Sequence, residues 1–263
     1  MMTEIYLTGF EKVELFYEVP EHLKSSEILR LRESDLELLN GELRENGSSL
    51  EEKIASGVIW RMGFPGMITD VKKLDYDRKS IRVTVSPIHP HRADLAYKND
   101  RTLLRNVVPL TVNALLKSAE GSFVLGVRGG NVEAGKIGII PGGHTDYDFP
   151  LITNTSETVM SEFEEEVGYT FDDRGNITIL GLFTNRDTRG INVMYAVQTN
   201  LTFPEILENW IRAKDRREHN TLFRATYEDI KQLAQTGKLV LDSREFTTTH
   251  FFQDCFKLYT RYE

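Results

Sequence analysis

The sequence of 263 residues predicts an α/β (α+β) fold, with an α/β/α sandwich in its C-terminal part. The first observation is the order of patterns after residue 100, where strands, a helix, further strands and a second helix follow one another. The second is a shorter set of strand and helix patterns before residue 100. The third is composition, because 40% hydrophobic and 27% charged residues are typical of a globular protein.

The N-terminal patterns predict an additional α+β region. Residues 5–19 include the alternating segment Val13-Glu14-Leu15-Phe16-Tyr17, which predicts a strand, and residues 81–85 alternate in the same way. Residues 25–43 are rich in Leu and Glu and predict a helix. Residues 63–66, Gly-Phe-Pro-Gly, predict a turn.

Prolines and polar residues predict a boundary near residue 100, between regions 1–100 and 101–263. The stretch Pro87-Ile88-His89-Pro90-His91-Arg92 motivates it, since paired prolines interrupt regular structure. His89 and His91 could be taken for a metal pair, but alternate residues beside prolines favour simple loop punctuation.

The C-terminal region shows a hairpin, a glycine-rich turn and two amphipathic helices. Residues 119–121, Ala-Glu-Gly, separate two apolar strands, and Pro141-Gly142-Gly143 ends a third. The patterns predict strands over residues 107–116, 121–127, 137–140, 177–184 and 191–197, and helices over residues 155–167 and 227–235.

Charge and composition exclude several classes of function. The 40 acidic and 32 basic residues give a net charge of −8, which argues against a nucleic-acid partner. No apolar stretch approaches the ~20 residues of a membrane span. The only cysteine, Cys255, fits a reducing compartment, so we expect a cytoplasmic protein. Because Cys255 lies in an aromatic run, we expect a buried structural thiol.

The predicted helix over residues 155–167 carries an unusual acidic face. Thr155 or Ser156 can cap its start, and Gly168 is a natural stop. Val159, Phe163 and Val167 are four residues apart and form one apolar stripe that faces a core.

Three carboxylates share the face beside this stripe, at the rim of the core. Glu162, Glu165 and Glu166 stand at i, i+3 and i+4, where like charges repel, and no lysine or arginine of the helix compensates them. A divalent cation such as Mg²⁺ would remove the repulsion, because it prefers carboxylate oxygens. A solvated acidic face is the alternative, but the preceding Pro-Gly-Gly turn, which lets a ligand approach the backbone, favours the metal site.

The stretch from Gly143 to Tyr169 resembles the Nudix box, written G-x5-E-x7-R-E-U-x-E-E-x-G-U with U apolar. The segment Glu162-Phe163-Glu164-Glu165-Glu166-Val167-Gly168-Tyr169 fits its second half position by position. Pro141-Gly142-Gly143 fits the usual opening. The resemblance covers about residues 103–235 and implies a Nudix-type sandwich.

Two departures separate this sequence from the pattern. Ser161 stands where the family has an arginine that pairs with the box carboxylates. Between Gly143 and Ser161 there are 17 residues, against 13 in the pattern. The first glutamate of the pattern falls at Thr153, and the nearest carboxylate, Glu157, is out of register.

The resemblance implies a hydrolase that cleaves a diphosphate linkage with Mg²⁺ or Mn²⁺. Glu162, Glu165 and Glu166 would hold the metal, and the catalytic residues would be Glu162 and Glu218, a loop carboxylate that precedes a strand-like segment. The implied substrate-binding residues are Gly142, Gly143, His144, Arg128 and Arg186, with Arg189 a further cation near the same site. His219 is expected to be solvated loop.

The expected partner is a small nucleotide, and a homodimer is left open. The Pro-Gly-Gly-His turn, the lengthened loop, Ser161 and the added N-terminal region are loosely similar to a Nudix branch associated with UDP-sugars. ADP-ribose and dinucleoside polyphosphates also stay open as substrates. The alternative function is a Nudix-fold binding or regulatory module without hydrolysis, which Ser161 favours and the intact glutamates disfavour.

Overall fold

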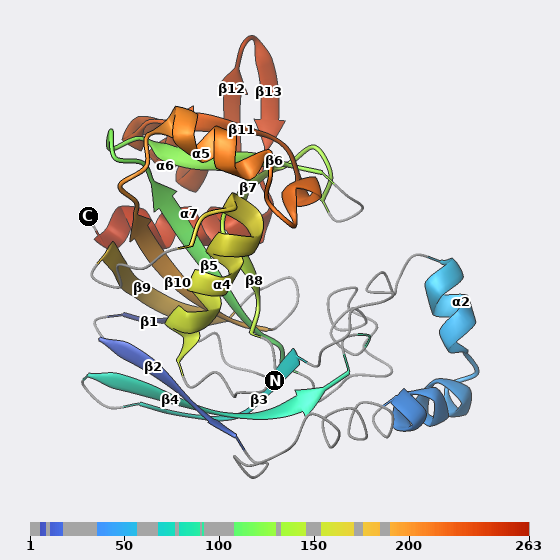
Figure 1. Ribbon diagram of the computed structural model, residues 1–263. Helices are drawn as coiled ribbons and strands as arrows, with labels where there is room; N and C mark the ends of the chain where they lie inside the picture. Colours follow the sequence, from blue (N-terminus) through green and yellow to red (C-terminus); the bar gives the residue numbers. More distant parts are fainter. Residues whose placement is uncertain are drawn as a thin grey trace.

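In the computed structural model, a large mixed sheet lies between helices, and a smaller sheet packs beside it (Figure 1). The structure describes residues 6–8, 11–17, 36–56, 68–76, 79–89, 91, 108–129, 133–145, 154–170, 176–184 and 190–262.

The main sheet follows the strand order β1-β9-β10-β5-β6-β11, with β7 pairing to β6 and β8 to β5. Its central pair, β5 and β10, is parallel, and Leu110 and Ile191 begin the register. The strands are β1 (Tyr6–Leu7), β5 (Leu110–Lys117), β6 (Phe123–Arg128), β7 (Ile137–Ile139), β8 (Gly142–His144), β9 (Ile177–Thr184), β10 (Ile191–Gln198) and β11 (His219–Ala225).

A tight hairpin joins β5 to β6, as predicted. The backbone N–H of Ser118 donates to the carbonyl of Ser122 at 2.8 Å, and that of Gly121 donates to Ser118 at 2.9 Å. Gly121 adopts φ 81°, a left-handed conformation that glycine reaches without strain.

The N-terminal part forms a three-stranded sheet of β2 (Lys12–Tyr17), β4 (Ser80–Ile88) and β3 (Ile68–Tyr76), in that order. The alternation in β2 is confirmed, because Val13 and Leu15 are buried and Glu14 is not. Val13 and Leu15 share one core cluster with residues of the main sheet such as Val112. The predicted α+β region is therefore present, and part of its core is common to both sheets.

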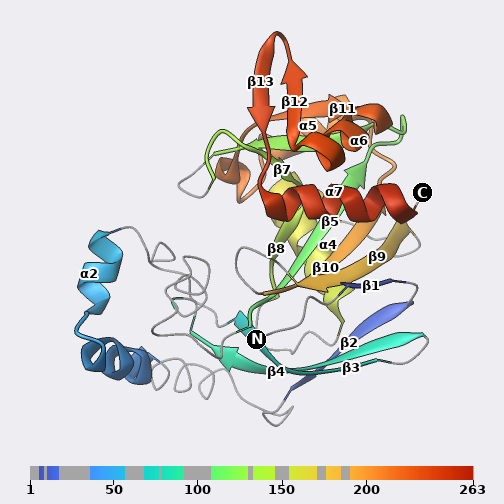
Figure 2. The ribbon, with the colours of Figure 1, turned by 180° about the vertical axis from the view of Figure 1, so that it is seen from behind.

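Helices cover both faces of the main sheet, which confirms the predicted α/β/α sandwich. Helix α4 (Thr155–Val167) packs into one core cluster with β5 and β10. Helices α6 (Tyr227–Thr236) and α7 (His250–Tyr262) pack into a second cluster, and Figure 2 shows α7 across the opposite face. Helix α5 (Phe203–Trp210) packs beside α4.

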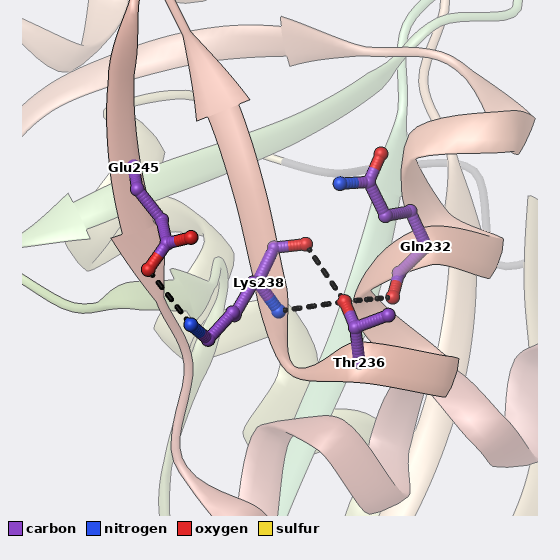
Figure 3. Close-up of polar contacts among 4 residues, drawn as sticks. All are labelled: Gln232, Thr236, Lys238 and Glu245. Atoms are coloured by element: carbon purple, nitrogen blue, oxygen red, sulfur yellow. Dashed lines mark hydrogen bonds and ion pairs between the residues drawn. The ribbon is translucent and has the colours of Figure 1, made fainter.

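A hairpin of β12 (Lys238–Leu241) and β13 (Arg244–Thr247) follows α6 and projects from the molecule (Figures 1 and 2), and Figure 3 shows polar contacts at its start. The hydroxyl of Thr236 donates to the carbonyl of Gln232 at 2.8 Å and accepts from the backbone N–H of Lys238 at 3.1 Å. Across the hairpin, Lys238 Nζ donates to Glu245 at 2.9 Å. These contacts fix the direction in which the chain leaves the helix.

Several N-terminal predictions fall partly outside the described residues. The helix predicted over residues 25–43 is seen from residue 36 and runs to 45, followed by α2 (Leu50–Ala55), while residues 63–66 are not described. His89 and His91 are buried, and their ring centroids lie 4.5 Å apart just after β4. The boundary near residue 100 stays a prediction, because residues 92–107 are not described. Among the described helices, none has the length and apolar character needed to cross a membrane.

Candidate active site

Helix α4 has the bounds that the sequence predicts, with a different N-terminal cap. The side chain of Asn154, one residue before the predicted cap, accepts a hydrogen bond from the backbone N–H of Ser156 at 3.0 Å. Thr155 instead shares a hydrogen bond with the hydroxyl of Tyr195 inside the core. Gly168 ends the helix at φ 75°, as expected.

The apolar stripe of α4 is confirmed, because Val159, Phe163 and Val167 are buried. The acidic face does not lie wholly at the rim of the core, and this corrects the prediction. Glu166 is only 2% exposed, whereas Glu164 is exposed. The helix turns far enough into the protein that one carboxylate of the cluster is inside it.

The glycine turn lies directly against these carboxylates. The backbone N–H of Gly142 donates to Glu166 Oε1 at 3.3 Å. A Cβ on Gly143 would stand 1.9 Å from Glu162 Oε1, so only glycine allows the carboxylate this close to the β8 backbone. The structure thus brings together four of the predicted site residues, Glu162, Glu166, Gly142 and Gly143.

Burial raises the pKa of Glu166 well above its ordinary value, since desolvation penalises the charged form. The negative charges of Glu218 and Glu162 raise it further. The Arg128 guanidinium and the hydrogen bond from Gly142 act in the opposite direction. These interactions place Glu218 and Arg128 within electrostatic reach of the carboxylates on α4.

Glu218 lies at the end of a short 3₁₀ helix, η2 (Arg216–Glu218), that follows α5. Its carboxylate forms an ion pair with Arg128 at 3.3 Å, where Arg128 is 17% and Glu218 45% exposed. The backbone N–H of Gly129 donates to the Glu218 carbonyl at 2.7 Å. The end of β6 therefore holds Glu218 from two sides.

His219 is buried, and the prediction of a solvated loop residue is wrong. Burial, with a smaller contribution from the charge of Arg128, lowers its pKa to about 3. Its imidazole is therefore neutral at physiological pH, and its buried Nε2 has no hydrogen-bond partner among the residues that the structure describes. One feature of the sequence is consistent with this burial, the glycine at position 126, on which the ring packs.

Glu165 points to a different group of residues. Lys214 Nζ donates to Glu165 Oε2 at 2.7 Å, and the backbone N–H of Asp215 donates to the Glu165 carbonyl at 2.9 Å. The pKa of Asp215 is raised to about 6. The largest cause is its partial burial, and the hydrogen bond between its carboxyl group and that of Glu165, together with the charge of Glu165, raises the pKa further. The cation that compensates the acidic helix thus comes from outside it, which sequence spacing could not show.

The carboxylates offer a partial fit to a divalent metal. Among the described residues, no group of three or more His, Cys, Asp or Glu side chains is arranged to hold an ion. Glu162 and Glu166 form a pair, and within the described part of the chain the buried Glu166 Oε2 has no hydrogen-bond partner. Because Mg²⁺ is commonly held by one or two carboxylates plus substrate phosphates, this pair fits such an ion.

The remaining candidates are placed as follows. His144 is buried in β8 opposite Thr111, and Ser161 is exposed on α4. Arg186 and Arg189 lie outside the described residues. Cys255 is fully buried in α7, and burial raises the pKa of its thiol, which confirms a structural role.

Several solved structures are similar to this chain. Neither a protein-family model nor a curated protein sequence matches the chain. A MutT protein from Methanosarcina mazei Go1 is 22% identical with a TM-score of 0.40, over 59% of this chain and 94% of its own. The Nudix domain of Shewanella oneidensis NrtR, solved with ADP-ribose, is 16% identical with a TM-score of 0.40, over 60% and 90%.

A third similar structure is a bifunctional enzyme. It is a bifunctional NMN adenylyltransferase/ADP-ribose pyrophosphatase from Francisella tularensis, solved with AMP and a Mn ion. It is 13% identical with a TM-score of 0.40, over 65% of this chain and 49% of its own. The first two of these structures are named as a MutT protein and a Nudix domain, and the acidic-helix motif of this chain resembles the Nudix box.

Proposed function

We propose that the protein is a Mg²⁺- or Mn²⁺-dependent hydrolase that cleaves a diphosphate linkage in a nucleoside diphosphate derivative. The observation that carries the proposal is the buried carboxylate of Glu166, which lies with Glu162 against the Gly142-Gly143 backbone. A buried carboxylate beside a second one is unfavourable without a cation. Such an arrangement is typical of sites that function with a bound metal.

Glu162 and Glu166 would hold the metal. When bound, the ion would offset charge on the diphosphate and lower the pKa of the attacking water. Glu165 was predicted as a third ligand, but its carboxylate already pairs with Lys214. The proposal therefore rests on the Glu162–Glu166 pair, and the substrate phosphates would supply further oxygens.

Glu218 is the proposed general base. It is 45% exposed, so water reaches it, and the Arg128 contact fixes its carboxylate near Glu166. Arg128 would also grip a phosphate oxygen, because a guanidinium donates several parallel hydrogen bonds. The backbone at Gly143 and the side chains of His144 and Arg186 are the other proposed substrate contacts.

The substrate that we propose is a nucleotide sugar such as a UDP-sugar, which rests on the sequence resemblance alone. A second candidate function, a nucleotide-binding module without hydrolysis, is favoured by one observation. Ser161 is exposed and supplies no positive charge to the acidic cluster. The two functions share the same fold and differ in turnover.

The experiment is a screen of nucleoside diphosphate derivatives with Mg²⁺ or Mn²⁺, with phosphate detected after coupling to a phosphatase. Glu166→Gln should abolish turnover, because glutamine keeps the shape and removes the charge. Glu164→Gln is the matched control, since Glu164 is exposed and points about 160° away around the helix. If wild type binds a nucleotide tightly and hydrolyses no compound, the binding module is the correct function.

The proposal includes the cytoplasm as location and a small nucleotide as partner, without nucleic acid or membrane. The net charge of −8 and the single buried cysteine support it. A homodimer remains an open part of the proposal.

A further inference from the structure

The segment of residues 211–218 joins α5 to β11 and carries Glu218, and its middle part is tied to the last turn of α4. Three contacts converge on Glu165. Lys214 Nζ donates to its carboxylate at 2.7 Å, the Asp215 carboxyl donates to the same carboxylate when it is protonated, and the Asp215 backbone N–H donates to its carbonyl at 2.9 Å. We name this segment the Glu218 loop.

The far end of the Glu218 loop is tied to β6. The backbone N–H of Gly129 donates to the Glu218 carbonyl at 2.7 Å, and Arg128 pairs with its carboxylate at 3.3 Å. A Cβ on Gly129 would stand 2.6 Å from the carbonyl oxygen of Arg217, so the loop lies directly on the strand end. Glu218 is thus three residues from an anchor on α4 and adjacent to an anchor on β6.

Lys214 is the cation of the α4 anchor, and α4 itself contains none. The positive charge of Lys214 also interacts with Glu162 and Asp215. Hydrogen bonding and charge from Glu165 raise the pKa of Lys214, so its ammonium stays charged. An exposed ion pair of this kind contributes little to global stability, but it can change how often one loop opens.

We propose that Lys214 is a positioning residue, which clamps the Glu218 loop onto α4 through Glu165 and thereby sets the place of the Glu218 carboxylate. The catalytic part of this inference rests on the proposed function. The clamp itself does not, because it concerns the closed and open populations of a loop in the protein without substrate.

The first test measures the loop directly with trypsin. Lys214→Met removes the charged contact of the clamp and leaves the cleavage sites after Arg212, Arg216 and Arg217. We expect cleavage at these sites, mapped by mass spectrometry, to become up to about fivefold faster, the scale of one exposed ion pair. Lys214→Arg should cleave at these sites like wild type.

Lys231→Met is the matched control, because Lys231 pairs with Glu228 on α6 at 2.9 Å, away from the loop. An unchanged cleavage rate in Lys214→Met, or an equal change in Lys231→Met, would overturn the clamp. This result does not depend on any hydrolytic activity, so it is distinguishable from failure of the proposed function.

The second test separates the clamp from simple charge compensation. In Lys214→Met, kcat should fall roughly tenfold while KM changes little, because the base is misplaced and substrate contacts remain. Adding Ser161→Arg places a cation one helical turn from Glu165 without tying the loop to it. The double variant should stay slow in turnover and fast in tryptic cleavage. Restored kcat would show that Lys214 is only a counter-charge and would overturn the proposal.

Discussion

The imidazole of His219 occupies the space in which a side chain at position 126 would begin. A Cβ on Gly126 would stand 2.0 Å from His219 Cδ2, far closer than two non-bonded carbon atoms can approach. Gly126→Ala must therefore displace the buried ring or bend β6. We expect a loss of about 1–3 kcal/mol in the free energy of unfolding, measured by urea denaturation.

Gly41→Ala is the control for this substitution. Gly41 lies in the helix over residues 36–45, and a Cβ there would meet nothing within 4 Å. Alanine should raise stability by up to ~1 kcal/mol, since it is the better helix former. If the two substitutions changed the free energy of unfolding equally, the packing of His219 would not exclude a side chain at position 126.

Glu166→Gln should stabilise the protein when no metal is present. Burial raises the pKa of Glu166, so its ionised form opposes folding, and the neutral amide removes that penalty while accepting from Gly142. We expect a gain of roughly 1–3 kcal/mol at pH 8 in chelator. The gain should shrink at pH 4, because below its unfolded-state pKa the glutamate is protonated in both states. A variant less stable than wild type at pH 8 would contradict this.

Divalent metal should stabilise wild type and leave Glu166→Gln nearly unchanged. Binding to the native state alone adds about 2.7 kcal/mol when the free ion is a hundredfold above its dissociation constant. Thermal melts with Mn²⁺ or Mg²⁺ against chelator measure the difference. Identical wild-type melts at saturating metal would count against the Glu162–Glu166 site.

Asp215 should give the protein a specific dependence on pH. Its pKa is raised from 3.8 to about 6 in the folded state, so its favourable contribution is present below 3.8 and is lost as pH rises through 6. Asp215→Asn should therefore be more stable than wild type at pH 7.5 and lose this advantage near pH 4. The readout is the urea midpoint at each pH.

Asp242→Asn serves as the comparison, because Asp242 is exposed in the turn between β12 and β13 and asparagine tolerates its φ of 47°. Its midpoints should follow those of wild type at every pH. If Asp215→Asn follows them too, the contact between Asp215 and Glu165 does not control the titration.

Elements with a strong period were predicted closely from the sequence. Helix α4 and strand β9 have the predicted bounds, since apolar residues at spacings of four or two mark a buried face. Helix α5 was not predicted, because Pro204 resembles a helix breaker but stands in the first turn, where proline is tolerated. Helix α7 was seen only as an aromatic run.

The residues of the candidate site also fall into a predicted group and a group that was missed. Glu162, Glu166 and the glycine turn were predicted because they lie within one short motif. Lys214 and Asp215 were missed, since they lie 49 and 50 positions after Glu165 and meet it only in the folded protein. The burial of His219 was likewise missed, because it depends on a glycine of another strand.

The two-residue strand β1 has a consequence for any fragment of this protein. Tyr6 and Leu7 pair with Phe183 and Leu182 and so close one edge of the main sheet. A fragment that begins near residue 101 would leave β9 with unpaired backbone groups and would uncover apolar residues that now pack on the N-terminal sheet. Such a fragment would tend to self-associate by pairing the exposed edge strands of two copies. By covering that edge, the N-terminal region would reduce aggregation of the protein.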